Sequence, residues 1–250
     1  MTTLAATGQE HYHELFQPLT PGFVHTPAND ADALIKLAKE HKTAAILMEC
    51  VQGEGGVIAL DKEFVARVAA FAAEEDILLM IDEVQTGNGR SGSLYAYMQF
   101  GITPDVVTTA KGIGGGLPLG AAMLGEKVQN VLGFGDHGST FGGNPVACAG
   151  AISILERIDD AFLKDVCTKS DYIFSSLKDA KGVRSVSGMG LMIGIETDRP
   201  APEIVKTCMA NGVLCLTAKS KVRLLPALNV PMDVLAEAIE IIKRACAEEE

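Results

Sequence analysis

The chain has 250 residues, of which 48% are hydrophobic, and it carries a formal net charge of −11. This length is enough to bury a substantial core in one large domain or two small ones. The acidic balance repels nucleic-acid phosphates and anionic membrane surfaces, so we expect neither as a partner. No apolar run reaches the roughly 18 residues of a membrane-spanning helix. Residues 1–8 lack the charged start and apolar stretch of a signal peptide, so we predict a cytoplasmic protein.

Cysteine spacing gives no sign of a metal site or a disulfide framework. None of the six cysteines forms a Cys-x-x-Cys pair, and most lie within apolar runs. The pattern predicts reduced, buried thiols and no bound metal. The six are Cys50, Cys148, Cys167, Cys208, Cys215 and Cys246.

The first part of the chain predicts an alternation of helices and buried strands. Residues 1–28 are expected to be loop, because prolines and Gly22 cluster there. Helices are predicted from Asp30 to about His41 and onward from Asp61. Continuous apolar runs predict buried strands at 44–48, 77–81, 106–110 and 120–124. Such strands separated by helices indicate an α/β fold with a largely parallel sheet.

The second part predicts a smaller α+β unit. Asn144-Pro145 is a helix-start signal, and helical patterns continue to about residue 180. The further predicted elements are strands at 191–196, 213–216 and 222–225, and helices at 201–211 and 232–247. We therefore predict two domains, 1–148 and 149–250, with a solvated tail at 248–250.

Four polar, glycine-rich segments follow predicted strands. They are Glu49–Gly56, Ile81–Gly87, Thr109–Gly116 and His137–Pro145. In open α/β sheets the ligand crevice lies at the carboxyl ends of the strands, so the four segments suggest one shared site. Each segment alone has a plainer interpretation, such as a surface lysine, a solvated acidic loop or a flexible glycine turn. The glycines at 114–116 lack the spacing of a P-loop or a dinucleotide fingerprint.

Taken together, the segments carry the groups that a pyridine aldehyde cofactor needs. A nucleophilic lysine such as Lys111 requires a deprotonated amine, which burial with a carbonyl cofactor achieves. A carboxylate near the ring nitrogen keeps that nitrogen protonated, and Asp82 at a strand end is placed for this. A phosphate needs N–H groups and hydroxyls at a helix start, which Ser139 and Thr140 offer.

The order of these motifs resembles the class III aminotransferases, most closely the acetylornithine and ornithine aminotransferases. The matching segments are Gln52-Gly53-Glu54-Gly55-Gly56, Asp82-Glu83-Val84-Gln85-Thr86-Gly87, the strand ending in Lys111, and Gly138-Ser139-Thr140-Phe141-Gly142-Gly143-Asn144-Pro145. The resemblance covers essentially the whole chain. It implies a fold type I pyridoxal-phosphate-dependent transferase, with a mostly parallel sheet in an incomplete large domain and a small C-terminal α+β domain. It also implies a homodimer with a shared active site.

The resemblance assigns cofactor roles to five residues. Lys111 is expected to hold pyridoxal 5′-phosphate as a Schiff base and to shuttle a proton between substrate Cα and cofactor C4′. Asp82 is expected to pair with the pyridine nitrogen and Gln85 with the ring hydroxyl. Thr140, with Ser139 beside it, is expected to reach the phosphate of a neighbouring subunit.

On the substrate side, the resemblance assigns Glu54 to the substrate pocket and Arg223 to the α-carboxylate, a bidentate task suited to guanidinium. The implied reaction is an acetylornithine transamination, which moves an amino group from N-acetylornithine to 2-oxoglutarate in arginine biosynthesis. Ornithine, succinylornithine and 4-aminobutyrate remain alternative donors, and aminomutases share related folds.

Two departures from the family pattern stand out. Cys50 occupies a position where the family usually has proline, which is a strand-end detail. Residues 1–8 resemble a segment that lies well inside family members. The glycine-rich part of the phosphate site and the aromatic that stacks on the ring normally precede it. We therefore expect residues 1–250 alone to be deficient in activity, and a non-catalytic fragment is the alternative interpretation.

Overall fold

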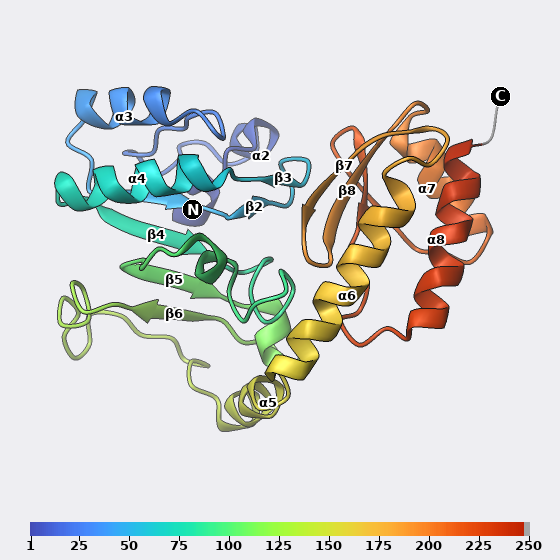
Figure 1. Cartoon of the computed structure of the whole chain (residues 1–250). Coiled ribbons are helices and arrows are strands. Elements are labelled where there is room, and N and C mark those ends of the chain that lie inside the picture. The colour runs from blue at the N-terminus through green and yellow to red at the C-terminus, as the bar shows by residue number, and fades with distance from the viewer. Residues whose placement is uncertain (248–250) are drawn as a thin grey trace.

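A computed structural model describes residues 1–247 of the chain and shows two sheets side by side, each covered by helices (Figure 1). The first sheet has the strand order β1-β4-β5-β6. Its strands are β1 (Ala45–Met48), β4 (Leu78–Asp82), β5 (Val106–Thr109) and β6 (Ala121–Leu124). The pairs β1–β4 and β4–β5 are parallel, whereas β6 runs antiparallel to β5.

Apolar faces hold the first sheet to its helices. Helices α3 (Ala31–Glu40) and α4 (Lys62–Glu74) lie on the same side of this sheet in Figure 1. The side chains of Val65, Val68 and Ile81 are fully buried in the core between them. Asp30 begins α3 as predicted, because its carboxylate accepts a hydrogen bond from the Ala33 amide.

The second sheet is antiparallel and has the order β7-β8-β10-β9. Its strands are β7 (Val183–Met189), β8 (Met192–Thr197), β9 (Leu216–Ala218) and β10 (Lys221–Leu224). Helices α6 (Asp160–Leu177), α7 (Ala201–Ala210) and α8 (Met232–Ala247) pack on it and share its apolar core. Helix α5 (Pro145–Leu155) leads into α6 (Figure 1), and the Asn144 side chain caps its start by accepting from the Val146 and Ala147 amides.

Shorter elements connect these layers. They are helices α1 (Thr2–Ala6) and α2 (Glu10–Glu14), the strand pair β2 (Val51–Gln52) and β3 (Ile58–Ala59), and the 3₁₀ helices η1 (Ala96–Phe100) and η2 (Lys111–Gly114). None of the helices within residues 1–247 is long and apolar enough to cross a membrane.

Several sequence predictions are wrong in detail. Residues 1–28 are not all loop, because α1 and α2 form ahead of the proline cluster. Strand β7 was missed, since its alternating polar residues hide a strand whose one face packs on the core. The strand predicted at 213–216 starts only at Leu216, because the Val213 amide donates to the Cys208 carbonyl at the end of α7. Not every cysteine is buried, since Cys167 is exposed on α6.

The predicted division into domains 1–148 and 149–250 stays a prediction. Its boundary lies inside α5. The predicted solvated tail at 248–250 lies outside the described residues.

Candidate active site

Two adjacent carboxylates follow β4, and they have different environments. Glu83 is fully buried, and its carboxylate accepts hydrogen bonds from the Thr86 hydroxyl and the Tyr97 amide. Burial raises the pKa of Glu83, and these hydrogen bonds counteract part of the rise. Asp82 is half-buried, and its Oδ1 accepts from the Val84 amide at 2.9 Å. Glu83 therefore stabilises the loop through its hydrogen bonds, and Asp82 is the carboxylate available to a ligand.

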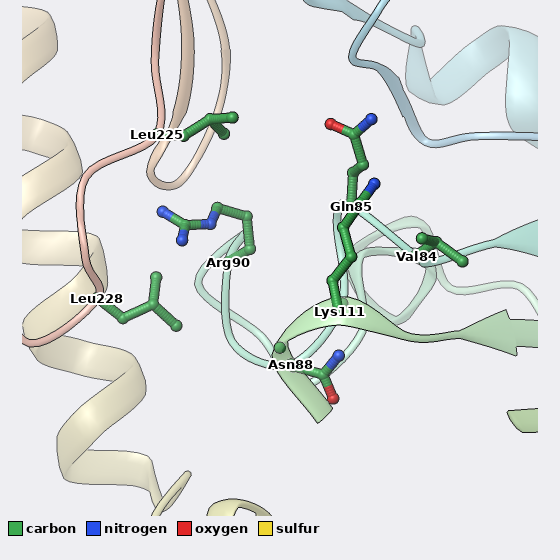
Figure 2. Close-up of a pocket in the computed structure, with 9 residues that line it drawn as sticks. Val84, Gln85, Asn88, Arg90, Lys111, Leu225 and Leu228 are labelled. Atoms are coloured by element: carbon green, nitrogen blue, oxygen red, sulfur yellow. The ribbon is translucent and has the colours of Figure 1, made fainter. Parts of the chain in front are cut away.

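Lys111 follows β5 in a constrained backbone conformation. Its φ is +50°, in the left-handed region that non-glycine residues seldom adopt and that clusters at functional sites. Buried Asn88 holds the preceding residues, since its Nδ2 donates to Thr109 Oγ1 at 3.1 Å and to the Ala110 carbonyl at 3.3 Å. The Lys111 side chain extends beside Gln85 (Figure 2) and is exposed. The burial expected of a nucleophilic lysine is thus not provided by residues 1–247.

Arg223 of the second sheet forms an ion pair with Glu54, which lies in the turn between β2 and β3. Arg223 on β10 donates from Nη1 to Glu54 Oε1 at 2.7 Å, and Gln85 Nε2 donates to the same oxygen at 3.2 Å. Arg223 is 7% exposed, and its Nε has no hydrogen-bond partner in the described part of the chain. The hydrogen bond from Arg223 lowers the pKa of Glu54, whose side chain is about half exposed. The Arg223 guanidinium is therefore held in place by a carboxylate of the protein.

Glu49 is a further carboxylate of this group, and no role was predicted for it. It follows β1, beside Asp82, because Met48 pairs with Ile81 in the sheet. Burial raises the pKa of Glu49 to about 7, and the charge of Asp82 adds to the rise. The amide of Gly53 donates to Glu49 and acts in the opposite direction. Its position directly after a predicted buried strand was visible in the sequence, but the pairing of that strand with the one that carries Asp82 comes only from the fold.

A cavity lies between the loops of the first sheet and the segment after β10 (Figure 2). Gln85, Asn88 and Lys111 line it from the first sheet, and Leu225 and Leu228 line it from the second. Arg90 also lines it, and no role was predicted for this residue.

Ser139 and Thr140 lie elsewhere. Both are exposed on the loop between β6 and α5, and neither lines the cavity that contains Lys111. The structure thus brings together Lys111, Gln85, Glu54 and Arg223 but does not add the two hydroxyls to them.

Comparison with known proteins assigns the family. The sequence model described as aminotransferase class-III matches residues 1–246. The chain belongs to this family. Class III aminotransferases are pyridoxal-phosphate-dependent enzymes, so the motif resemblance and the fold agree.

Curated relatives support a narrower similarity. The acetylornithine aminotransferase of Haemophilus ducreyi is 45% identical over 99% of this chain, and that of Methanocaldococcus jannaschii is 41% identical over 96%. The chain covers 64% of the first relative's length and 62% of the second's.

Solved structures show the same fold. The ornithine aminotransferase of Toxoplasma gondii superposes with a TM-score of 0.90 at 28% identity, over 98% of this chain and 60% of that one. The N-acetylornithine aminotransferase of Stenotrophomonas maltophilia superposes with a TM-score of 0.83 at 32% identity, over 91% of this chain and 63% of that one. The Toxoplasma structure is described with pyridoxal phosphate at its active site.

Proposed function

We propose that the chain carries the lysine and the carboxylate-binding arginine of an aminotransferase that moves an amino group from N-acetylornithine to 2-oxoglutarate. The observation that carries this proposal is the Arg223–Glu54 ion pair, joined through Gln85 to the loop beside Lys111. Gln85, which donates to Glu54, lines the same cavity as the exposed Lys111, and the buried Arg223 guanidinium binds the other side of that Glu54 contact.

The residues present fit pyridoxal phosphate at its ring. The cofactor, when bound, supplies an aldehyde for the amino group and a protonated ring that stabilises negative charge on carbon. Lys111 would hold the aldehyde carbon, and Asp82 would hold the proton on the ring nitrogen. Asp82 suits this task, because only its Oδ1 has a hydrogen-bond partner assigned within the loop. Ser139 and Thr140 do not meet this group within one chain, so we propose that they hold the phosphate of a second subunit.

Lys111 also serves as the base in this proposal. Its Nζ takes the proton from the substrate carbon that bears the amino group and returns a proton in the reverse half of the reaction. Because the main chain at Lys111 is fixed by Asn88, the amine starts from a defined point at the end of β5.

Arg223 orients both substrates, and Glu54 must give way for it to do so. Both N-acetylornithine and 2-oxoglutarate carry carboxylates, and an anion competes with Glu54 for the same Nη1. Release of Glu54 costs little desolvation, because its side chain is half exposed and returns to water. The Nε of Arg223 is buried and has no hydrogen-bond partner in the described chain, so Glu54 leaves part of the donor capacity of this guanidinium unused.

Similarity to relatives of known activity supports the choice of amino donor in this proposal. Curated acetylornithine aminotransferases are 40–45% identical to this chain, and this similarity supports N-acetylornithine as the donor. A place in arginine biosynthesis, a homodimer with a shared active site and a cytoplasmic location belong to the same proposal.

The test is a transamination assay with pyridoxal phosphate, N-acetylornithine and 2-oxoglutarate, with glutamate as the measured product. Lys111→Ala is expected to lower turnover by about 1,000-fold or more while the fold stays intact. Lys127→Ala removes an exposed lysine that pairs with Asp76, so it is the matched control and is expected to leave turnover unchanged. Substantial turnover by the Lys111→Ala protein would refute the assignment.

A further inference from the structure

Arg90 joins the two sheets through both its side chain and its main chain. Its Nη1 donates to the Leu191 carbonyl at 3.1 Å and to the Pro226 carbonyl at 2.6 Å. Its own carbonyl accepts from the Leu191 amide at 2.9 Å. The approach is close enough that a Cβ on Gly190 would come within 2.4 Å of the Arg90 oxygen. The turn between β7 and β8 is therefore packed tightly against this one residue.

The two carbonyls mark the ends of the strands that carry and support Arg223. Leu191 immediately precedes β8, and Pro226 lies two residues beyond β10. The strands are antiparallel neighbours, with Leu224 paired to Ile193. The start of β8 and the end of β10 therefore lie at the same end of this strand pair, and Arg90 binds next to both strands there.

The bonds of Arg90 differ in kind from those of Arg223. Both acceptors of Arg90 Nη1 are neutral main-chain carbonyls. Burial lowers the pKa of Arg90 to about 10, which leaves it charged at neutral pH. Its guanidinium turns away from Lys111 and toward Leu225 and Leu228 (Figure 2). A substrate carboxylate that displaces Glu54 from Arg223 thus leaves the contacts of Arg90 in place.

Two connections consequently run from the loop after β4 to β10. The first consists of the hydrogen bonds from Gln85 and from Arg223 to Glu54, and the bond from Arg223 breaks when a substrate carboxylate replaces Glu54. The second is the hydrogen bond from Arg90 to the Pro226 carbonyl, and substrate binding does not break it. We propose that Arg90 is a positioning residue that keeps Arg223 at a fixed place relative to Lys111 while Glu54 is displaced. This inference rests on the carboxylate-binding role proposed for Arg223.

A control for the loss of a buried cation is available on the same segment. Lys169 on α6 is 3% exposed and donates to the Leu228 carbonyl at 2.9 Å, and its other partner is Asp165 on the same helix of the second sheet. Lys169→Met therefore loosens the segment after β10 without cutting a connection to the first sheet.

The experiment compares Arg90→Met, Arg90→Lys and Lys169→Met in the purified protein loaded with pyridoxal phosphate. Arg90→Met is expected to raise the KM for 2-oxoglutarate, and the Kd for the unreactive dicarboxylate glutarate, by about tenfold or more. The visible absorbance of the bound cofactor should be unchanged, and Lys169→Met should alter KM and Kd by less than about twofold. Values for Arg90→Met within about twofold of the wild type, or equal increases in both variants, would overturn the inference. If Arg90→Met does not fold, Arg90→Lys keeps the buried charge on a shorter side chain that does not reach the position of Nη1, and the same criteria apply to it.

Hydrogen exchange separates this inference from the proposed function. If the wild-type protein does not bind glutarate, the carboxylate role of Arg223 is refuted. Hydrogen exchange then tests separately whether Arg90 anchors the ends of β8 and β10. Arg90→Met is expected to speed the exchange of amides at the paired ends of β8 and β10 by about tenfold, and Lys169→Met is not. Unchanged exchange at those amides in Arg90→Met refutes the anchoring of the strand ends.

Discussion

The loop after β4 and the segment between β6 and α5 were both expected to supply site residues, yet they differ in how the chain holds them. In residues 83–92, Glu83, Asn88 and Ser91 are buried, and Arg90 is tied to the second sheet. In residues 129–144, nearly every side chain is exposed, including the ring of Phe141 at 85%. Contacts within one chain therefore fix the surroundings of Lys111 but not those of Ser139 and Thr140.

The physical reason lies in what each segment can bury. The loop after β4 satisfies its polar groups internally, as Glu83 does with Thr86 and Tyr97. The second segment contains five glycines, which lose much conformational entropy on ordering. Its apolar rings Phe134 and Phe141 contribute almost no burial in return. Such a segment needs a further surface to hold it, which agrees with the proposed role of Thr140 toward a second subunit.

The largest effect within the ordered loop is expected from Asp82→Asn. Losing the charge beside the ring nitrogen should lower kcat/KM by about 100-fold or more. Glu83→Gln changes a neighbouring carboxylate of similar size that points into the core. It should lower the free energy of unfolding by about 1–3 kcal/mol with little change in kcat/KM of the folded protein. Steady-state kinetics and urea unfolding of both variants check this, and equal losses of activity would show that neither residue has its proposed role.

Arg223→Lys is expected to have the next largest effect. The ammonium keeps the charge but loses the bidentate geometry, so the KM for 2-oxoglutarate should rise by about 30-fold, or about 2 kcal/mol. Arg184→Lys is the matched control, since Arg184 pairs with Asp198 at the surface of the second sheet. A KM that is equally insensitive to both changes would remove Arg223 from the substrate site.

Glu49→Gln is expected to change how the free energy of unfolding depends on pH. Folding raises the pKa of Glu49 from 4.5 to about 7, so between these values the folded protein holds a proton that the unfolded chain releases. The free energy of unfolding of the wild type is therefore unaffected by this group below pH 4.5. It falls as the pH rises from 4.5 to 7, by about 3 kcal/mol at most. In cofactor-free protein, Glu49→Gln should therefore gain stability over the wild type as the pH rises through this window. Urea unfolding at pH 5 and pH 8 measures the difference, and a constant or shrinking difference would contradict the raised pKa of Glu49.

Phe141→Ser should have the smallest effect on the stability of a single chain. Because the ring is exposed, the free energy of unfolding at low protein concentration should change by less than about 0.5 kcal/mol. Ile81→Ala in β4 should cost about 2–5 kcal/mol, since Ile81 is fully buried. If the segment lies in a homodimer interface, sedimentation should show that Phe141→Ser weakens self-association. A large loss of single-chain stability would mean that the ring is packed within its own subunit.

The strands of the first sheet could be predicted because they contain apolar runs, as in Leu78–Ile81 of β4. Their polar ends then placed Asp82, Glu54 and Lys111 near one site. The reversed direction of β6 could not be predicted, since an apolar run has no direction of its own. Strand β7 escaped prediction because Arg184, Ser185 and Ser187 make it polar on one face.

Site residues whose partners are distant in sequence were the hardest to predict. Arg90 binds carbonyls 101 and 136 residues away, and carbonyls leave no mark in the sequence. Glu49 takes its environment from a strand pairing between β1 and β4 that only the fold creates. Arg223 was identified through family resemblance, and its pairing with Glu54, 169 residues away, emerged only from the structure.

The most direct test of the central claim is to find which residue carries the cofactor. The purified protein is incubated with pyridoxal phosphate, reduced with borohydride, digested and analysed by mass spectrometry. Reduction should abolish the visible absorbance band and leave a pyridoxyl group on the peptide that contains Lys111, with the same peptide unmodified in Lys111→Ala. A pyridoxyl group on another lysine, or a protein that stays colourless with excess pyridoxal phosphate, would contradict the claim that Lys111 is the residue that binds the cofactor.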